Sequence, residues 1–149
     1  MMETIGMHTP SKAVFASSLH WGAPLQVGTH QMAKVLLKRG WDVAFISNPI
    51  SPLHVLKGLS HELKQRFHLY RGGGEWSYGH HLYTYVPGAI LAPARKPLLD
   101  NMTLYESWTK GGFPSLKRKL KENGFSKVDL LFIDCIHFTM LPGMIDAKK

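Results

Sequence analysis

The segment from Lys12 to Pro52 constrains the fold of this chain more than any other. The apolar run Lys12–Ser17 predicts a short buried strand, and the following residues, 18–25, carry Gly22 and Pro24, which favour a turn. From Gln26 the spacing of apolar residues changes to that of a helix. The segment therefore begins with a strand, an exposed turn and a helix in direct succession.

The helix is predicted over Gln26–Arg39, with Gly40 as its stop signal. Its apolar side is predicted to carry Met32, Ala33, Val35, Leu36 and Leu37. The opposite, polar side is predicted to carry His30, Lys34 and Lys38, at positions i, i+4 and i+8. A second strand, Trp41–Ser47, follows, and this strand–helix–strand connection has the length of a right-handed parallel crossover. We therefore expect an α/β fold, with a Rossmann-like parallel sheet and helices on both faces.

The rest of the chain is compatible with this fold class. The nearly continuous apolar run Val128–Asp134 predicts a third parallel strand, buried on both faces. Shorter strands are predicted at Arg66–Tyr70 and His81–Val86. Helical segments are predicted at Leu53–Gln65 with a break near Gly58, at Leu98–Lys110, at Pro114–Asn123 and at Ile136–Ala147.

Composition narrows the class of protein. With 149 residues, 44% hydrophobic and 19% charged, the chain has the size and composition of one globular domain. Its single cysteine, Cys135, excludes an internal disulfide and fits a reducing cytoplasm. The net charge of +8 suits an anionic membrane surface, an anionic substrate or nucleic acid. The clustered cations Lys117, Arg118, Lys119 and Lys121 fit a solvated helix face first, acidic lipid headgroups second and nucleic acid last.

The candidate ligand site follows from the predicted topology. The carboxyl ends of parallel strands share one edge of a sheet, and ligands bind there. The segments expected at this edge are 17–26, 47–52 and 134–139. In the first of them, Trp21 offers a flat apolar face for stacking on a sugar ring, and His20 can exchange a proton near neutral pH. The alternative is that Trp21 covers the sheet and His20 is merely exposed.

The other motifs give weaker evidence for a cofactor, metal or catalytic site. The first turn lacks the G-x-G-x-x-G fingerprint, which argues against a dinucleotide cofactor, and Gly72–Gly74 fit a flexible connection. The histidine spacings do not predict a metal site. Cys135 is expected to be a structural cysteine, and Asp134 is expected to cap the helix that follows it. No catalytic residue, cofactor or metal ligand is therefore assigned from motifs.

Several of these segments together resemble a known family. They are the first-strand end Ser17–Trp21, the helix Thr29–Arg39 with Gly40, the second strand with Asn48–Pro52, Tyr85–Pro87 with Pro93, and the strand Val128–Asp134. On these segments the chain resembles the first part of a GT-B glycosyltransferase. It is most similar to the acceptor-side domain of bacterial exopolysaccharide transferases, including the xanthan-type glucuronosyltransferase.

The resemblance implies a function. It implies a two-domain enzyme that transfers a sugar from a nucleotide-sugar donor to a glycan or lipid-linked acceptor, with the donor bound only by a C-terminal domain. It implies that the catalytic aspartate falls just past Lys149 and that this chain is inactive alone. It also implies acceptor contact by the first loop. The residues assigned to that contact are Ser18, His20, Trp21 and Gln26.

The expected organisation is an N-terminal tail at residues 1–11 and a Rossmann-like acceptor-side domain at residues 12–149, truncated at its C-terminus. The expected location is cytoplasmic, peripheral on the inner face of the membrane, where basic residues are attracted to anionic lipid. One competing hypothesis is a non-enzymatic basic α/β module that binds an anionic membrane or another acidic partner; the sequence lacks the aromatic and basic pattern of RNA-binding sheets. Another is a complete small α/β enzyme that uses Cys135 or His20.

Overall fold

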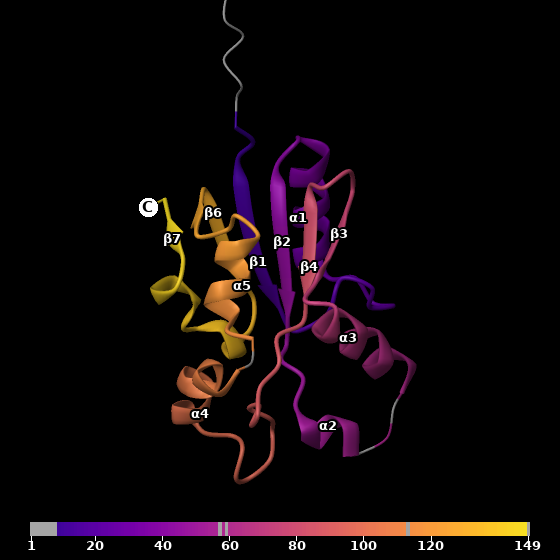
Figure 1. The fold of residues 1–149 in the computed structure, drawn as a ribbon, viewed down its shortest axis with the longest axis vertical. Helices are drawn as coiled ribbons and strands as arrows, with labels where there is room; N and C mark the ends of the chain where they lie inside the picture. Colours follow the sequence, from indigo (N-terminus) through magenta and orange to yellow (C-terminus); the bar gives the residue numbers. More distant parts are fainter. Residues whose placement is uncertain (1–8, 57, 59, 113, 149) are drawn as a thin grey trace, which may run out of the picture.

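The computed structural model describes residues 9–56, 58, 60–112 and 114–148. Its centre is a five-stranded sheet with the order β3-β4-β2-β1-β6. The parallel strands are β1 (Lys12–Ser17), β2 (Asp42–Ser47), β4 (Leu82–Tyr85) and β6 (Leu130–Ile133). The short β3 (Glu75–Ser77) runs antiparallel to β4 at the edge. Figure 1 shows the parallel arrows pointing to the same end of the molecule, which confirms the predicted α/β class. Most of the predicted N-terminal tail, residues 1–8, lies outside the described residues.

The order of the strands places a topological switch point beside β1. The chain moves outward from β1 through β2 to β4, and then returns to place β6 on the other side of β1. The register pairs Lys12 with Asp42 along β2, and Ala13 with Leu130 along β6. In open parallel sheets such a reversal opens a crevice at the carboxyl ends of the two strands. The predicted edge with three shared strand ends is therefore confirmed.

The helix α1 (Gly28–Lys38) covers one face of the sheet, but with a different side from the one predicted. Its fully buried residues are Thr29, His30 and Ala33. Met32 and Val35, expected against the sheet, are 44% and 48% exposed. The prediction for His30 was wrong because the small Ala33 brings this side of the helix close to the sheet, where the imidazole packs against Phe45.

The opposite face of the sheet is covered by the second half of the chain. Its elements are α4 (Met102–Ser107), η1 (Trp108–Gly111), α5 (Leu116–Glu122), η2 (Ile136–Phe138) and η3 (Leu141–Gly143). They bury Trp108, Leu116, Leu120 and Phe138 against Val14 and Tyr83 of the sheet. Figure 1 shows α5 and α1 on opposite sides of the strands, so helices flank both faces as predicted. The basic run of α5 therefore points away from the core, while Leu116 and Leu120 face it.

Three predicted elements differ from the structure. The predicted strand Arg66–Tyr70 lies inside the helix α3 (His61–Arg71), which follows the short helix α2 (Pro52–Leu56). The predicted helix Ile136–Ala147 is replaced by η2, η3 and β7 (Asp146–Ala147), because Pro142 lacks the N–H that a continuous helix needs.

The predicted strand Val128–Asp134 divides at Asp129 into β5 (Lys127–Val128), which pairs with β7, and β6. The carboxylate of Asp129 accepts a 2.9 Å hydrogen bond from the backbone N–H of Lys12, which holds the division in place. The residues of β6 are only partly buried, because β6 lies at the edge of the five-stranded sheet rather than at its centre.

Candidate functional site

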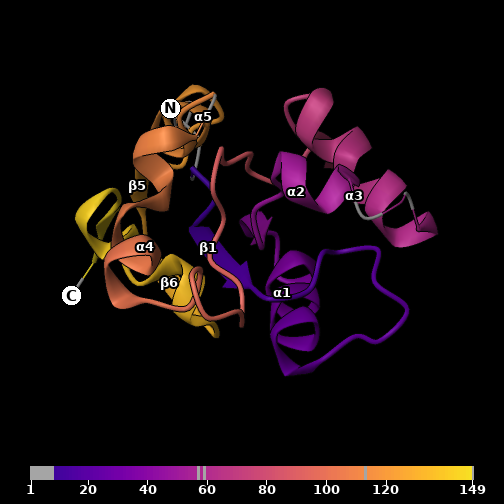
Figure 2. The ribbon, with the colours of Figure 1, turned by 90° about the horizontal axis from the view of Figure 1, so that it is seen from below.

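The carboxyl ends of the parallel strands form one end of the domain. Figure 2 shows this end, with the first loop beside α1 on one side, α2 and α3 above it, and the segments near α4 and β6 on the other side. The loops at residues 17–26, 47–52 and 134–139 all leave the sheet here, as predicted. The candidate site is therefore described from the β1–β6 junction outward.

The carboxylate of Asp134 joins three elements at the switch point. Its Oδ2 accepts hydrogen bonds from the hydroxyl of Ser17, at 2.9 Å, and from the hydroxyl of Thr29 in the first turn of α1. Its Oδ1 accepts a 3.2 Å hydrogen bond from the backbone N–H of Ser18. Asp134 itself is exposed. The result is a polar cluster at the position where this topology places ligands: the exposed carboxylate of Asp134 is bonded to the buried hydroxyls of Ser17 and Thr29.

This network corrects the expected role of Asp134. No side-chain hydrogen bond caps η2, and Cys135 rather than Asp134 occupies its N-cap position. The Asp134 side chain points back to β1 because the hydroxyls of Ser17 and Thr29 and the N–H of Ser18 converge on it. Asp134 therefore ties the two strands of the switch point to α1.

His20 lies under the first loop and is only 2% exposed, so the alternative in which it is merely exposed does not hold. Its Nε2 lies 3.2 Å from Oε1 of Gln65, and its Nδ1 lies 3.7 Å from a carboxylate oxygen of Glu62. That Nδ1 is buried and has no hydrogen-bond partner among the described residues. The backbone carbonyl of His20 accepts a 3.1 Å hydrogen bond from Nε2 of His30. His20 thus joins the first loop to both α1 and α3.

Trp21 and Gln26 shape the same loop. The Trp21 ring stacks on His30, with centroids 5.7 Å apart, and meets Phe45 edge-on at 5.1 Å. It is half-buried, and it also meets the Tyr78 ring edge-on, with centroids 6.1 Å apart. The amide of Gln26 donates to the Trp21 carbonyl at 3.4 Å, and its oxygen accepts from Lys34. The amide nitrogen and oxygen of the Gln26 side chain therefore both form hydrogen bonds within the loop and α1.

A cavity of about 490 Å³ lies between the first loop and α3. His20, Trp21 and Gly22 line one side of it. The residues on the other sides are His61, Lys64, Gln65, His68, Leu69, Glu75 and Thr84. The structure thus brings the predicted residues His20 and Trp21 together in one cavity. It places Ser18 in the separate Asp134 cluster and Gln26 inside the loop.

The sequence predictions missed the polar side chains that α3 contributes to this cavity. Gln65 fell at the end of a predicted helix, and the residues after it were predicted as a strand. The sequence does carry a helix signal here. Serine is a favoured N-cap residue, and Leu63 and Tyr70 recur at helical spacing. In the structure the Ser60 hydroxyl accepts a 3.2 Å hydrogen bond from the Leu63 N–H as the helix cap. Recognising one helix from Ser60 to Gly72 would have placed Gln65 and His68 on one element.

Cys135 follows Asp134 of this polar cluster, but its thiol is expected to be unreactive at neutral pH. Burial, and secondly the charge of Asp134, raise the pKa of its thiol to about 12. At neutral pH it is therefore protonated and a poor nucleophile. Burial likewise lowers the pKa of His137. The small-enzyme hypothesis in which Cys135 is the nucleophile has no support in this geometry.

Comparison with protein families identifies the domain. The model of the family "Glucuronosyltransferase GumK, N-terminal domain" matches residues 15–145. The chain belongs to this family. Comparison with curated proteins and with solved structures gave no match.

Membership of the GumK N-terminal domain family agrees with the fold. The resemblance found in the sequence is confirmed, and the chain is the N-terminal, Rossmann-like domain of an exopolysaccharide-type GT-B glycosyltransferase. In this GumK-type domain the switch point lies between β1 and β6, and the matched residues include Asp134, His20 and Trp21. Among the described residues, no helix has the length and apolar character needed to span a bilayer.

Proposed function

We propose that this domain holds the acceptor while a sugar is transferred to it from a nucleotide-sugar donor, and that the acceptor is a glycan or a lipid-linked glycan. The acceptor sugar lies against the first loop, in the cavity that His20 and Trp21 share with α3. The donor binds to the C-terminal domain of the enzyme. The isolated N-terminal domain is inactive.

The observation that carries this proposal is the position and chemistry of the cavity. It adjoins the carboxyl end of the sheet, and it combines the half-buried indole of Trp21 with amide, imidazole, ammonium and carboxylate groups. Sugars present both apolar ring faces and many hydroxyls, so a half-buried tryptophan beside convergent polar groups matches them.

Two observations at the edge of the sheet support the proposed inactivity of the isolated domain. Both oxygens of Asp134 already accept hydrogen bonds from the chain itself, and the Cys135 thiol stays protonated at neutral pH. Removing a proton from an acceptor hydroxyl requires a group within hydrogen-bond reach that is able to accept it. The proposal assigns that group, and the donor site, to other parts of the enzyme.

A transfer assay tests the inactivity. The purified chain is incubated with radiolabelled UDP-glucuronic acid and a panel of mono- and disaccharide acceptors. We expect no labelled product above the rate with heat-denatured protein. Turnover by the chain alone, abolished in a His20→Ala or Cys135→Ala variant, would refute the two-domain proposal in favour of a complete small enzyme.

Acceptor binding is tested separately by NMR. Titration with cellobiose, a glucose disaccharide, is expected to shift the indole N–H of Trp21 and the side-chain amide of Gln65, while UDP leaves both unchanged. The double variant Lys64→Ala/His68→Ala, on the exposed side of the cavity, is expected to weaken binding. Lys38→Ala, at the far end of α1, is the matched control. Shifts confined to residues outside the cavity would contradict the proposed site.

A further inference from the structure

The turn between β3 and β4 holds two large side chains on a strained backbone. Tyr78 has a φ of 51° and His80 a φ of 67°, with Gly79 at 64° between them. Among the described residues, these are the non-glycine residues with a positive φ. Glycine, asparagine and aspartate are favoured at such positions, because a larger side chain is crowded by its own backbone. Strain of this kind is concentrated at binding sites, so the contacts of these two rings were followed outward.

The two rings contact tryptophans that belong to opposite faces of the sheet. Tyr78 meets the Trp21 ring edge-on, with centroids 6.1 Å apart and an interplanar angle of 86°. His80 packs on Trp76, with centroids 5.8 Å apart, and Trp76 packs against the core on the α5 side. Of this pair, Tyr78 is therefore the residue that contacts the first loop, beside the candidate acceptor cavity.

Tyr78 is more accessible than the tryptophan it contacts. It is 56% exposed, whereas Trp21 is half-buried and also packs on His30, at 5.7 Å, and Phe45, at 5.1 Å. Those two contacts hold Trp21 from the core side. An edge-to-face pair with one ring in water stabilises the fold by an amount similar to the cost of the strained backbone. The domain therefore gains little stability from a tyrosine here, which favours a role in binding.

The Tyr78 ring extends the aromatic surface beyond the cavity of His20 and Trp21. Glu75 and Thr84 line that cavity, and they pair across β3 and β4. Tyr78 follows three residues after Glu75, a spacing that spans about 10 Å along a strand. It is not among the residues that line the cavity. A ligand that is longer than the cavity and runs past Trp21 therefore reaches Tyr78 next.

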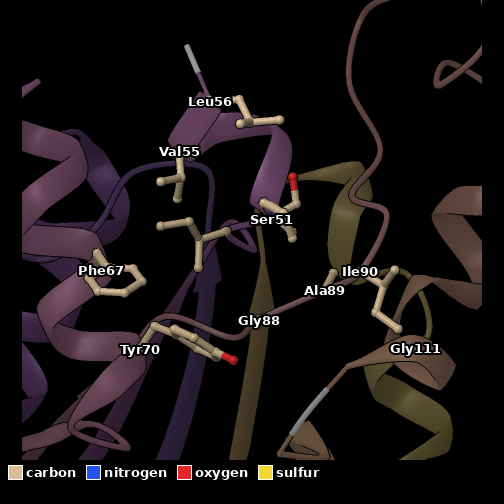
Figure 3. Close-up of a pocket in the computed structure, with 11 residues that line it drawn as sticks. Ser51, Val55, Leu56, Phe67, Tyr70, Gly88, Ala89, Ile90 and Gly111 are labelled. Carbon is tan, nitrogen blue, oxygen red and sulfur yellow. The ribbon is translucent and has the colours of Figure 1, made fainter. Parts of the chain in front are cut away.

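Another side of α3 offers little to a second sugar. A cavity of about 460 Å³ lies between α2, α3 and the segment after β4. Figure 3 shows Val55 and Phe67 around this space, with Ile90 on its far side. The Ser51 hydroxyl in its lining lies 2.9 Å from Nδ1 of His54, so it is already bonded. Because a sugar needs several hydrogen-bond partners, this mainly apolar lining is unsuited to it.

We propose that Tyr78 forms an aromatic subsite beside Trp21, which binds the sugar next to the one in the cavity. The acceptor is accordingly an oligosaccharide of at least two sugars. An exposed phenol ring offers an apolar face and a hydroxyl, which match the ring face and the hydroxyls of a sugar. This inference rests on the proposed acceptor function and adds to it a residue that determines specificity.

The test is NMR titration of the whole chain with cellobiose and, separately, with methyl β-D-glucoside, which presents a single sugar. The indole N–H of Trp21 reports the binding of both. We expect cellobiose to bind more tightly. Tyr78→Asn is expected to weaken cellobiose by about fivefold and to leave methyl β-D-glucoside unchanged. Tyr78→Phe, which keeps the ring, is expected to retain the preference. Equal weakening of both sugars in Tyr78→Asn would overturn the subsite.

His80→Asn is the matched control, because it replaces the other strained residue of the same turn with one that tolerates this conformation. It is expected to leave the binding of both sugars unchanged. Urea denaturation separates loss of binding from loss of fold, and Tyr78→Asn is expected to be at least as stable as the native chain. A marked loss of stability in Tyr78→Asn would overturn the proposal, since Tyr78 would then be a structural contact of Trp21.

The outcomes distinguish this inference from the proposed acceptor function. Binding of neither sugar to the native chain overturns both. Equal binding of the two sugars, with shifts at Trp21 and Gln65, leaves the acceptor function standing and overturns the subsite. A preference for cellobiose that is lost in Tyr78→Asn, and kept in Tyr78→Phe and His80→Asn, is the result that supports it.

Discussion

The hydroxyl of Ser17, at the last residue of β1, donates a 2.9 Å hydrogen bond to the carboxylate of Asp134, the residue that follows β6. These residues are 117 positions apart in the chain. Because Thr29 and the backbone of Ser18 bind the same carboxylate, one side chain fixes the relative positions of two strands and a helix. The polar cluster at the switch point is therefore a structural tie as well as part of the candidate site.

Replacing Asp134 with alanine is expected to lower the free energy of unfolding. Hydrogen bonds to a charged group contribute about 1.5–3 kcal/mol, and since Asp134 is exposed we expect a loss near the lower limit. Urea denaturation measures it. The control is Asp146→Ala, which removes an exposed carboxylate from β7. Equal losses in both variants would show that the hydrogen bonds to Asp134 contribute nothing to the free energy of unfolding.

His30→Ala is expected to destabilise the domain by about 2–4 kcal/mol, because it leaves a cavity beneath α1 and removes one of the two donors to the His20 carbonyl, the other being the Ala23 N–H. Lys38→Ala, on the same helix but exposed, is expected to change stability by less than about 0.5 kcal/mol. Thermal unfolding followed by circular dichroism compares the two. Similar values for the two variants would mean that His30 is solvated as the sequence pattern predicted.

Alkylation should report the raised pKa of Cys135. Burial holds the thiol protonated until the pH approaches about 12, whereas the unfolded chain ionises near the ordinary value of 9.0. Between these values the unfolded state binds fewer protons than the native state, so this thiol makes stability fall as pH rises. Iodoacetamide is expected to react slowly with the native protein at pH 9 and rapidly in denaturant. Equal rates would contradict the burial.

Gly88→Ala tests the close approach between the segment after β4 and α3. A Cβ at Gly88 would lie 2.2 Å from Cε2 of Tyr70, so the ring must move, and we expect a loss of about 1–3 kcal/mol. Gly28→Ala is the matched control, because nothing lies within 4 Å of a Cβ there. In α1 that change is expected to stabilise by about 0.5 kcal/mol. Chemical denaturation of both variants decides whether the Tyr70 contact is the cause.

The sequence was sufficient for the parallel core and its shared edge. The change from strand to helical spacing between Ser17 and Gln26, the stop at Gly40 and the apolar run near Leu130 are local signals that survive in the structure. Part of helix α3 was not predicted. Its sequence is polar and rich in histidine, so its few apolar residues show the helical spacing only weakly, and the run Arg66–Tyr70 resembled a strand.

The site could be predicted only in outline. The loop with His20 and Trp21 was found because it follows a strand. Its role in acceptor binding stays a prediction. The partners Gln65 and Asp134 come from elements far along the chain, and no local pattern indicates which side chains will converge. The burial of His30 depends on the packing of Ala33 against the sheet, and helical periodicity alone assigns a histidine to the solvent.

The position of β1 between β2 and β6 has a consequence for biosynthesis. The pairing of Ala13 with Leu130 cannot form until nearly the whole domain has left the ribosome. Until then one edge of the buried strand β1 is open to other chains, and the long loop that must close makes folding slow. We therefore expect any need for a chaperone during translation to arise from this strand order.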